Sequence, residues 1–149
     1  MLRLAVILRK DLTMPIRYRY DQPAALVRVD AAGDLTGADL RDYFVALVRE
    51  SWWRPGLRIL ADNRGVTSLP SLPELQDSAI ALAQSQAYRG GARVAILVAT
   101  TLQYGAVRQF QGLSGDDGGG DIALFHDEAE ALAWLRDSSA GTAPDTAVR

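Results

Sequence analysis

The sequence lacks cysteine and has one histidine and one lysine among its 149 residues. Without cysteine it forms no disulfide and has no thiolate nucleophile, and this fits a reducing compartment, so we expect a cytoplasmic protein. His126 alone does not supply the several ligands of a zinc site. Lys10 leaves almost no position for a Schiff-base lysine or a phosphate-binding lysine. We therefore expect neither a metal nor a cofactor.

Strong charge and long apolar runs are also missing. The net charge of −2 argues against a nucleic-acid-binding protein, because such proteins present a basic face. The apolar run within residues 1–13 is too short to span a membrane. The segment "MPIRYRY" from Met14 is typical of the start of a domain, so we interpret residues 1–13 as an N-terminal extension, either native or from a mis-assigned start codon. Residues 137–149 lack apolar side chains able to pack, which predicts a disordered tail.

The spacing of apolar residues predicts alternating strands and helices in the order β-β-α-β-α-β-α-β-α. Period-two alternation predicts strands at 16–21 and 24–33, joined by a turn at Gln22 and Pro23, with Gly33 ending the second strand. The alternation predicts an α/β fold with a single mixed, mainly parallel sheet of about five strands, covered by about four helices. The later strands are expected at 57–63, 92–100 and 122–125, and the helices at 37–51, from 73 to the Arg-Gly-Gly at 89–91, at 102–113 and at 128–136.

Two details of the third helix bear on the sites below. Leu102, Ala106, Phe110 and Leu113 recur at helical spacing and predict the face that packs on the sheet. The segment "SGDDGGGD" that follows predicts a solvated loop, because it has neither the EF-hand spacing nor the Gly-Lys-Ser/Thr ending of a P-loop.

The order of elements and three local patterns resemble the SpoIIAA-like branch of the STAS domains, also described as STAS/SEC14-like. The patterns are "LRILADNRGV" at the third strand, "LQYGAVRQFQGLS" at the third helix and "IALFHDEAEALAWL" at the end. The resemblance covers residues 14–136. It implies a bacterial regulatory or adaptor domain that acts by binding another protein, as the anti-sigma-factor antagonists do. The SEC14-like description implies the alternative, a carrier of a small molecule or lipid.

The region after the third strand is the first candidate for a binding edge. In the well-studied antagonists, a partner kinase phosphorylates a serine there, within an Asp-Ser-Ser-Gly-like signature that this chain replaces with "DNRGVTSLPSLPE". Ser71 precedes Glu74 by three residues, which predicts a capping box, although a helix N-terminus would also stabilise a phosphate on Ser71 or Ser68. Asp62 and Arg64 either line a crevice at the carboxyl end of the strand or belong to a turn, and turn chemistry explains these residue types better.

A second candidate surface combines aromatic residues with an arginine. We expect one of Trp52 and Trp53 to close the core, which leaves the other partly exposed for a partner or a second copy of the chain. Tyr104 and Arg108 lie one helical turn apart, either as part of an interface or as a solvated face. An enzyme would need Asp62, Arg64 and His126 to meet in one cleft, and no nucleophile–base set is evident, so we expect no catalysis.

Overall fold

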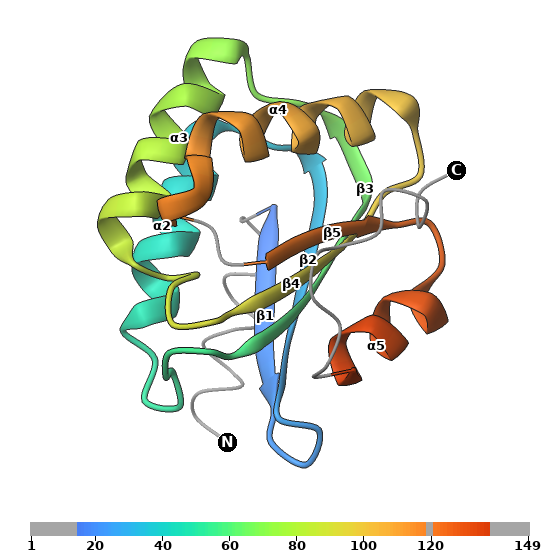
Figure 1. The fold of residues 1–149 in the computed structure, drawn as a ribbon. Coiled ribbons are helices and arrows are strands. Elements are labelled where there is room, and N and C mark those ends of the chain that lie inside the picture. The colour runs from blue at the N-terminus through green and yellow to red at the C-terminus, as the bar shows by residue number, and fades with distance from the viewer. Residues whose placement is uncertain (1–14, 119–120, 138–149) are drawn as a thin grey trace.

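The computed structural model describes residues 15–118 and 121–137 (Figure 1). The extension predicted at residues 1–13 and, except for Asp137, the tail predicted at 137–149 lie outside these described residues.

The described residues form five strands and four helices, and they confirm the predicted order and the mixed, mainly parallel sheet. The spatial order of the strands is β1-β2-β3-β4-β5, with β1 antiparallel to β2 and all other neighbours parallel. The strands are β1 (Ile16–Asp21), β2 (Leu26–Asp34), β3 (Arg58–Ser68), β4 (Arg93–Leu97) and β5 (Asp121–Phe125). The helices are α2 (Gly37–Val48), α3 (Leu72–Ser85), α4 (Thr101–Gly118) and α5 (Glu128–Arg136).

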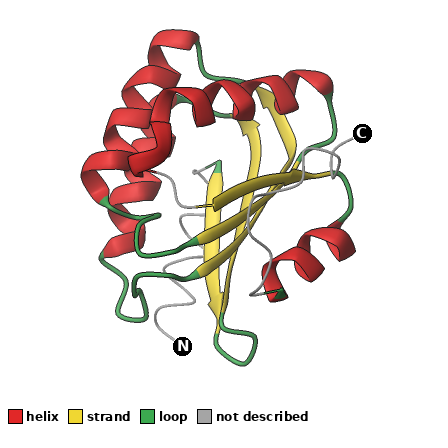
Figure 2. Ribbon diagram, viewed as in Figure 1, coloured by secondary structure: helices red, strands yellow, loops and turns green. Residues whose placement is uncertain are grey.

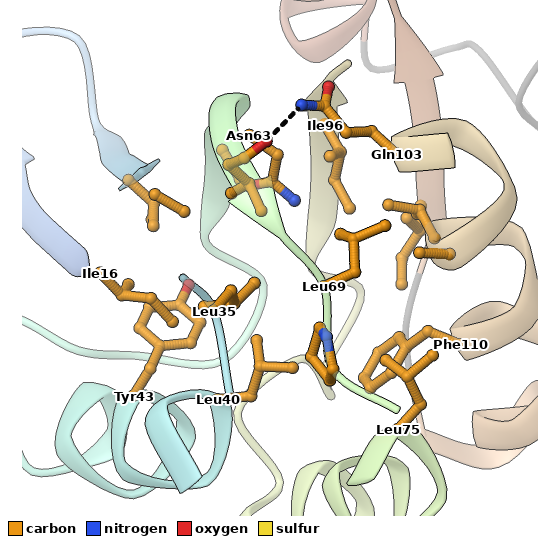
Figure 3. A pocket seen from close by; sticks show the side chains of 18 of the residues that line it. Ile16, Leu35, Leu40, Tyr43, Asn63, Leu69, Leu75, Ile96, Gln103 and Phe110 are labelled. Carbon is orange, nitrogen blue, oxygen red and sulfur yellow. Dashed lines mark hydrogen bonds between the residues drawn. The ribbon is translucent and has the colours of Figure 1, made fainter. Parts of the chain in front are cut away.

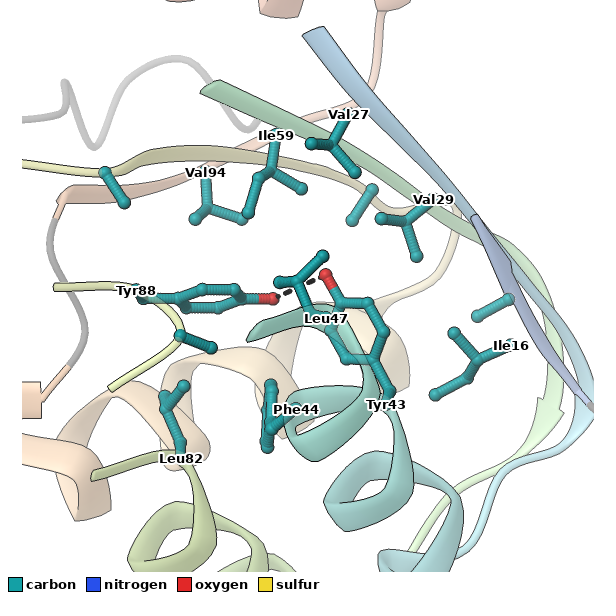
Figure 4. Close-up of a cluster of buried hydrophobic side chains, with 14 of the residues drawn as sticks. Ile16, Val27, Val29, Tyr43, Phe44, Leu47, Ile59, Leu82, Tyr88 and Val94 are labelled. Atoms are coloured by element: carbon teal, nitrogen blue, oxygen red, sulfur yellow. Dashed lines mark hydrogen bonds between the residues drawn. The ribbon is translucent and has the colours of Figure 1, made fainter. Parts of the chain in front are cut away.

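The helices are divided unequally between the two faces of the sheet (Figures 1 and 2). The three crossover helices α2, α3 and α4 cover one face, and α5 packs on the other, against β3, β4 and β5. The larger core lies under the three helices, where Phe44 and Leu47 of α2 face Ile59 and Val94 of the sheet (Figure 4). The smaller core joins α5 to the opposite face through Leu60, Ala95, Phe125, Trp134 and Leu135, among others.

Helices α2 and α3 both start at capping boxes, and the one at Ser71 was predicted. The Thr36 side chain accepts a hydrogen bond from the Asp39 amide, and the Asp39 carboxylate accepts one from the Thr36 amide at 3.0 Å. Ser71 and Glu74 form the same arrangement at α3. Glu74 also accepts a hydrogen bond from the Gly37 amide at 3.0 Å, so its carboxylate joins the first turns of both helices.

Three local predictions were wrong. Gly33 does not end β2: it adopts a positive φ of 75° within a strand that continues to Asp34. The segment 114–118 continues α4, whereas a loop was expected. The inward face of α4 also differs, since Leu102 and Leu113 are 75% and 39% exposed while Gln103, next to Leu102, is buried.

Candidate functional site

An apolar cavity of about 90 Å³ lies between the sheet and helices α2, α3 and α4 (Figure 3). It is near the carboxyl ends of β2 and β3, the edge at which open α/β sheets bind ligands. The following residues line it: Ile16, Val29, Ala31, Leu35, Leu40, Tyr43, Phe44, Ala61, Asn63, Val66, Leu69, Pro70, Leu75, Tyr88, Ile96, Gln103, Ala106, Val107, Phe110 and Ile122.

The sheet side of the cavity is shaped by an irregularity in β3. Side chains alternate along a strand, so Ala61 and Asn63 face the helices while Asp62 faces away. The register with β2 then shifts, because Asp62 pairs with Asp30 but Gly65 pairs with Ala32, which leaves one extra residue on β3. After this bulge Val66 lines the cavity. The turn predicted at Asp62 and Arg64 does not end the strand, which continues to Ser68, although the Asp62 carboxylate does accept a hydrogen bond from the nearby Arg64 amide as that prediction implied.

Gln103 closes one end of the cavity wall, and its amide is fully used. Its Oε1 accepts from the Ala99 amide at 2.7 Å, and its Nε2 donates to the carbonyls of Val66 and Arg64 at 2.9 and 3.2 Å. The side chain, only 4% exposed, thus ties the start of α4 to the bulge in β3. Apolar periodicity gave no signal for this residue, because an amide is expected on the solvent side of a helix.

Asn63 is the second polar residue that the sequence analysis did not select. It is half-buried and lines the cavity on the sheet side (Figure 3). Its side-chain amide makes no hydrogen bond to any of the described residues. The strand alternation of Ile59, Ala61 and Asn63 carried the signal, which the prediction of a turn at this point concealed.

Two tyrosines complete the polar inventory of the wall. The hydroxyl groups of Tyr43 and Tyr88 form a hydrogen bond of 3.1 Å, and both side chains are buried (Figure 4). Burial raises the pKa of Tyr43 well above its ordinary value and raises the pKa of Tyr88 to about 12. Both residues are therefore neutral phenols across the physiological pH range.

Asp62 and Arg64 lie together on the other face of the sheet. The Asp62 carboxylate accepts from the Arg64 guanidinium at 2.8 and 3.0 Å and from the Arg64 amide at 3.0 Å. These hydrogen bonds hold the pKa of Asp62 below its ordinary value. Arg64 and Arg28 each lie about 4 Å from Glu128, in the first turn of α5. The pair belongs to a charged group beside α5, and neither residue lines the cavity.

The two predicted serines are both at the surface near the start of α3. Ser68 is the last residue of β3, and its carbonyl accepts a hydrogen bond from the Leu35 amide at 2.9 Å. Ser71 is the N-cap of α3, and its side chain accepts from the Glu74 amide. Both side chains are exposed and neither lines the cavity.

The predicted aromatic surface is divided between two places. Trp52 and Trp53 both pack against the larger core as half-buried side chains, so the expectation that only one of them closes it was wrong. Trp52 stacks on Tyr20, with ring centroids 5.0 Å apart, because the loop after α2 lies over β1. Tyr104 is half-buried and Arg108 is exposed on α4.

The structure does not bring the three residues of the enzyme hypothesis together in the cavity. His126 follows β5, and its Nδ1 lies 2.9 Å from the Val98 carbonyl. None of Asp62, Arg64 and His126 lines the cavity. Within residues 15–118 and 121–137, no group of three or more potential metal ligands occurs, and no helix is long and apolar enough to cross a membrane.

Comparisons with known proteins support the fold. A crystal structure of an uncharacterised DUF3478 protein with a SpoIIAA-like fold from Shewanella loihica superposes with a TM-score of 0.54 at 24% sequence identity. The alignment covers 80% of this chain and 91% of that one, and it is a likeness of fold. A search of curated proteins finds no match. The sequence model of the SpoIIAA-like family matches residues 26–136, from the start of β2 to the end of α5, and the chain therefore belongs to the SpoIIAA-like family.

Proposed function

We propose that this domain binds a small apolar molecule in the cavity between its sheet and helices α2, α3 and α4, and that it does so without catalysis. The cavity itself is the observation that carries the proposal. Protein interiors are close-packed and hold few voids larger than a water molecule, which occupies about 30 Å³ in the liquid. An apolar void of 90 Å³ costs at most about 2 kcal/mol of stability when it is empty. A ligand that fills it recovers part of that cost.

The chemistry of the wall supports binding over catalysis. Tyr43 and Tyr88 are the titratable residues among those that line the cavity, and burial raises the pKa of both phenols. General acid–base catalysis works best with a group whose pKa is near the working pH, and these phenols do not meet that condition. Asp62 and Arg64 form hydrogen bonds with each other beside α5 and do not line the cavity.

The volume limits the ligand. Pockets for drug-sized molecules measure about 300–1,000 Å³, and an engineered apolar cavity of about 150 Å³ binds benzene or xenon. At about 90 Å³ this cavity accepts a molecule with a handful of non-hydrogen atoms and is too small for the acyl chain of a lipid. Of the two ligand classes implied by the SEC14-like description, the small molecule is therefore the one we propose.

The test is a cavity-filling substitution. Ala106 lines the cavity from α4, so Ala106→Leu places an isobutyl group where the ligand would lie. Wild-type protein should show saturable amide shifts under xenon and with cyclopentane in ¹H–¹⁵N NMR spectra, centred on the lining residues, and Ala106→Leu should abolish them. Ala133→Leu, the same exchange at an exposed position of α5, is the matched control. The proposal is refuted if wild-type protein shows no saturable shifts with xenon and none with cyclopentane.

The second candidate function is the binding of a regulatory protein partner at the outer side of α3. Leu72 and Ile80 are 45% and 57% exposed, and they lie on one side of the helix immediately after the Ser71 cap. Exposed apolar residues beside the position of the family's switch serine favour this function. Co-expression with kinase-like anti-sigma factors should give a complex that Ile80→Asp disrupts. Ala129→Asp, at an exposed position of α5 on the other face of the sheet, should leave the complex intact. Mass spectrometry should then find phosphate on Ser68 or Ser71, and if no such factor forms a complex this candidate fails.

A further inference from the structure

The cavity wall holds a hydrogen-bond donor that has no acceptor within residues 15–118 and 121–137. Tyr43 and Tyr88 have one hydroxyl proton each, and the single bond between the two oxygens uses one of these protons. Whichever hydroxyl donates, the remaining proton has no acceptor among the described residues. Both side chains are more than nine-tenths buried, at 5% and 6% exposed, and both line the cavity. A buried donor without a partner is costly, so the site gains from a ligand that accepts this bond.

Asn63 supplies a second unused polar group to the same wall. Its amide nitrogen carries two protons, and none is donated to a described residue. Gln103 does not compete for a ligand, because its own amide is taken up by Ala99, Val66 and Arg64. The polar groups that remain for a ligand are thus the free phenol proton and the Asn63 amide.

Charge is absent from the wall. Among the described residues that line the cavity there is no Arg, Lys, His, Asp or Glu. A carboxylate or an ammonium group would lose its hydration and find no counter-charge, which is strongly unfavourable in an apolar site. The ligand therefore has to be neutral.

We propose that the cavity takes a small neutral molecule with an apolar body and one hydrogen-bond acceptor, such as a ketone, an ester or an ether, and that the Tyr43–Tyr88 pair or the Asn63 amide donates to that acceptor. This inference rests on the proposed function, since it names the chemical class of ligand for the same cavity. It adds that the polar groups of the wall select the ligand, where the proposed function requires only apolar contact.

The experiment compares cyclopentanone with cyclopentane, two probes of nearly the same shape. Their absolute affinities are not compared directly, because water solvates the ketone better than the hydrocarbon. The informative quantity is the ratio of the two dissociation constants, measured by NMR titration in wild-type protein and in each variant. The principal variant is Tyr43→Phe/Tyr88→Phe, because either single substitution leaves one phenol proton available to the ligand. Asn63→Leu removes the other donor.

One of these variants should move the ratio against the ketone by about three- to tenfold, the effect of losing one hydrogen bond between neutral groups. Tyr104→Phe removes a hydroxyl outside the cavity and should leave the ratio unchanged. Isobutyrate, a carboxylate of similar size, should show no saturable binding at neutral pH. If both probes bind and neither variant changes the ratio, or if isobutyrate binds as well as cyclopentanone, the inference is overturned while the proposed function stands. If no probe binds, the proposed function is refuted, and the inference that rests on it is refuted with it.

Discussion

Replacing Gln103 by leucine should destabilise the domain by about 2–3 kcal/mol, although the substitution adds an apolar side chain to an apolar core. The Gln103 amide makes three hydrogen bonds, to the Ala99 amide and to the carbonyls of Val66 and Arg64. Leucine makes none of them. Leaving a buried polar group without a partner costs about 1–3 kcal/mol, and the Val66 carbonyl is buried. Water reaches the Ala99 and Arg64 positions more easily, because both residues are exposed, so their contribution is smaller.

The assay is urea unfolding at pH 7, which gives the free energy of unfolding of each protein. The slope of this free energy against urea concentration is compared as well, because an unchanged slope means that only stability has changed. Gln109→Leu, the same exchange at an exposed position of α4, is the control and should change stability by no more than about 0.5 kcal/mol. Gln103→Glu keeps the acceptor for the Ala99 amide but turns the donor toward two carbonyls into a negative charge. It should be destabilised at pH 7 and recover as the pH falls, because the protonated carboxyl can donate to a carbonyl.

The reasoning is refuted if Gln103→Leu costs no more than Gln109→Leu with an unchanged slope. That result would mean that the bulge of β3 satisfies its carbonyls without the side chain. The hydrogen bonds of Gln103 would then be incidental to the shape of the cavity.

Three further predictions follow from groups outside the cavity. Asp62→Asn should cost less than about 1 kcal/mol at neutral pH, because the pair with Arg64 is partly exposed and solvent weakens it. Arg64 lowers the pKa of Asp62 in the folded protein. The stability that this pair contributes is therefore present above the unfolded pKa of about 3.9 and is lost as the pH falls through the folded pKa. Acid unfolding of the wild-type and Asp62→Asn proteins, followed by circular dichroism, should show this loss in the wild type alone. Glu74→Gln should weaken the joined starts of α2 and α3, and faster amide hydrogen exchange there would show it, whereas unchanged exchange would contradict it. Arg93→Met should be neutral or stabilising in thermal unfolding, because Nε and Nη2 of the buried guanidinium lack hydrogen-bond partners within the described part of the chain. A loss above about 2 kcal/mol would show that the hydrogen bond from Nη1 to the Asp137 carbonyl and the contact with the Trp134 ring together outweigh this cost.

The fold was predictable because the apolar periods of strands and helices agree with the layers that the chain forms. Residues such as Phe44 and Leu47 lie on the buried face that their helical spacing indicates. The capping boxes at Thr36 and Ser71 are local in sequence, so they mark the starts of α2 and α3 without knowledge of the rest of the molecule. Strands that alternate with helices then leave few arrangements other than a mainly parallel sheet.

The polar residues of the cavity were not predictable in the same way. Gln103 is buried because two carbonyls of β3, 37 and 39 residues earlier in the chain, point toward it. The spacing of apolar residues along α4 does not indicate that contact. The periodicity therefore assigned Leu102 and Leu113 to the face that packs inward. The free donor of the tyrosine pair likewise depends on a contact between positions 45 residues apart. Such pairings are a product of the tertiary structure.

The sequence analysis selected Asp62, the residue directly before the cavity-lining Asn63. The two residues are neighbours, but side-chain alternation in β3 sends the aspartate toward α5 and the asparagine into the cavity. The Asp62 charge stays where Arg64 and water can solvate it, and the neutral Asn63 amide enters a wall whose described side chains carry no charge. A strand that placed Asp62 inward would bury a carboxylate without a partner, at a cost that the domain's marginal stability does not tolerate. The register of β3 therefore keeps the Asp62 carboxylate out of the cavity, as the proposal of a neutral ligand requires.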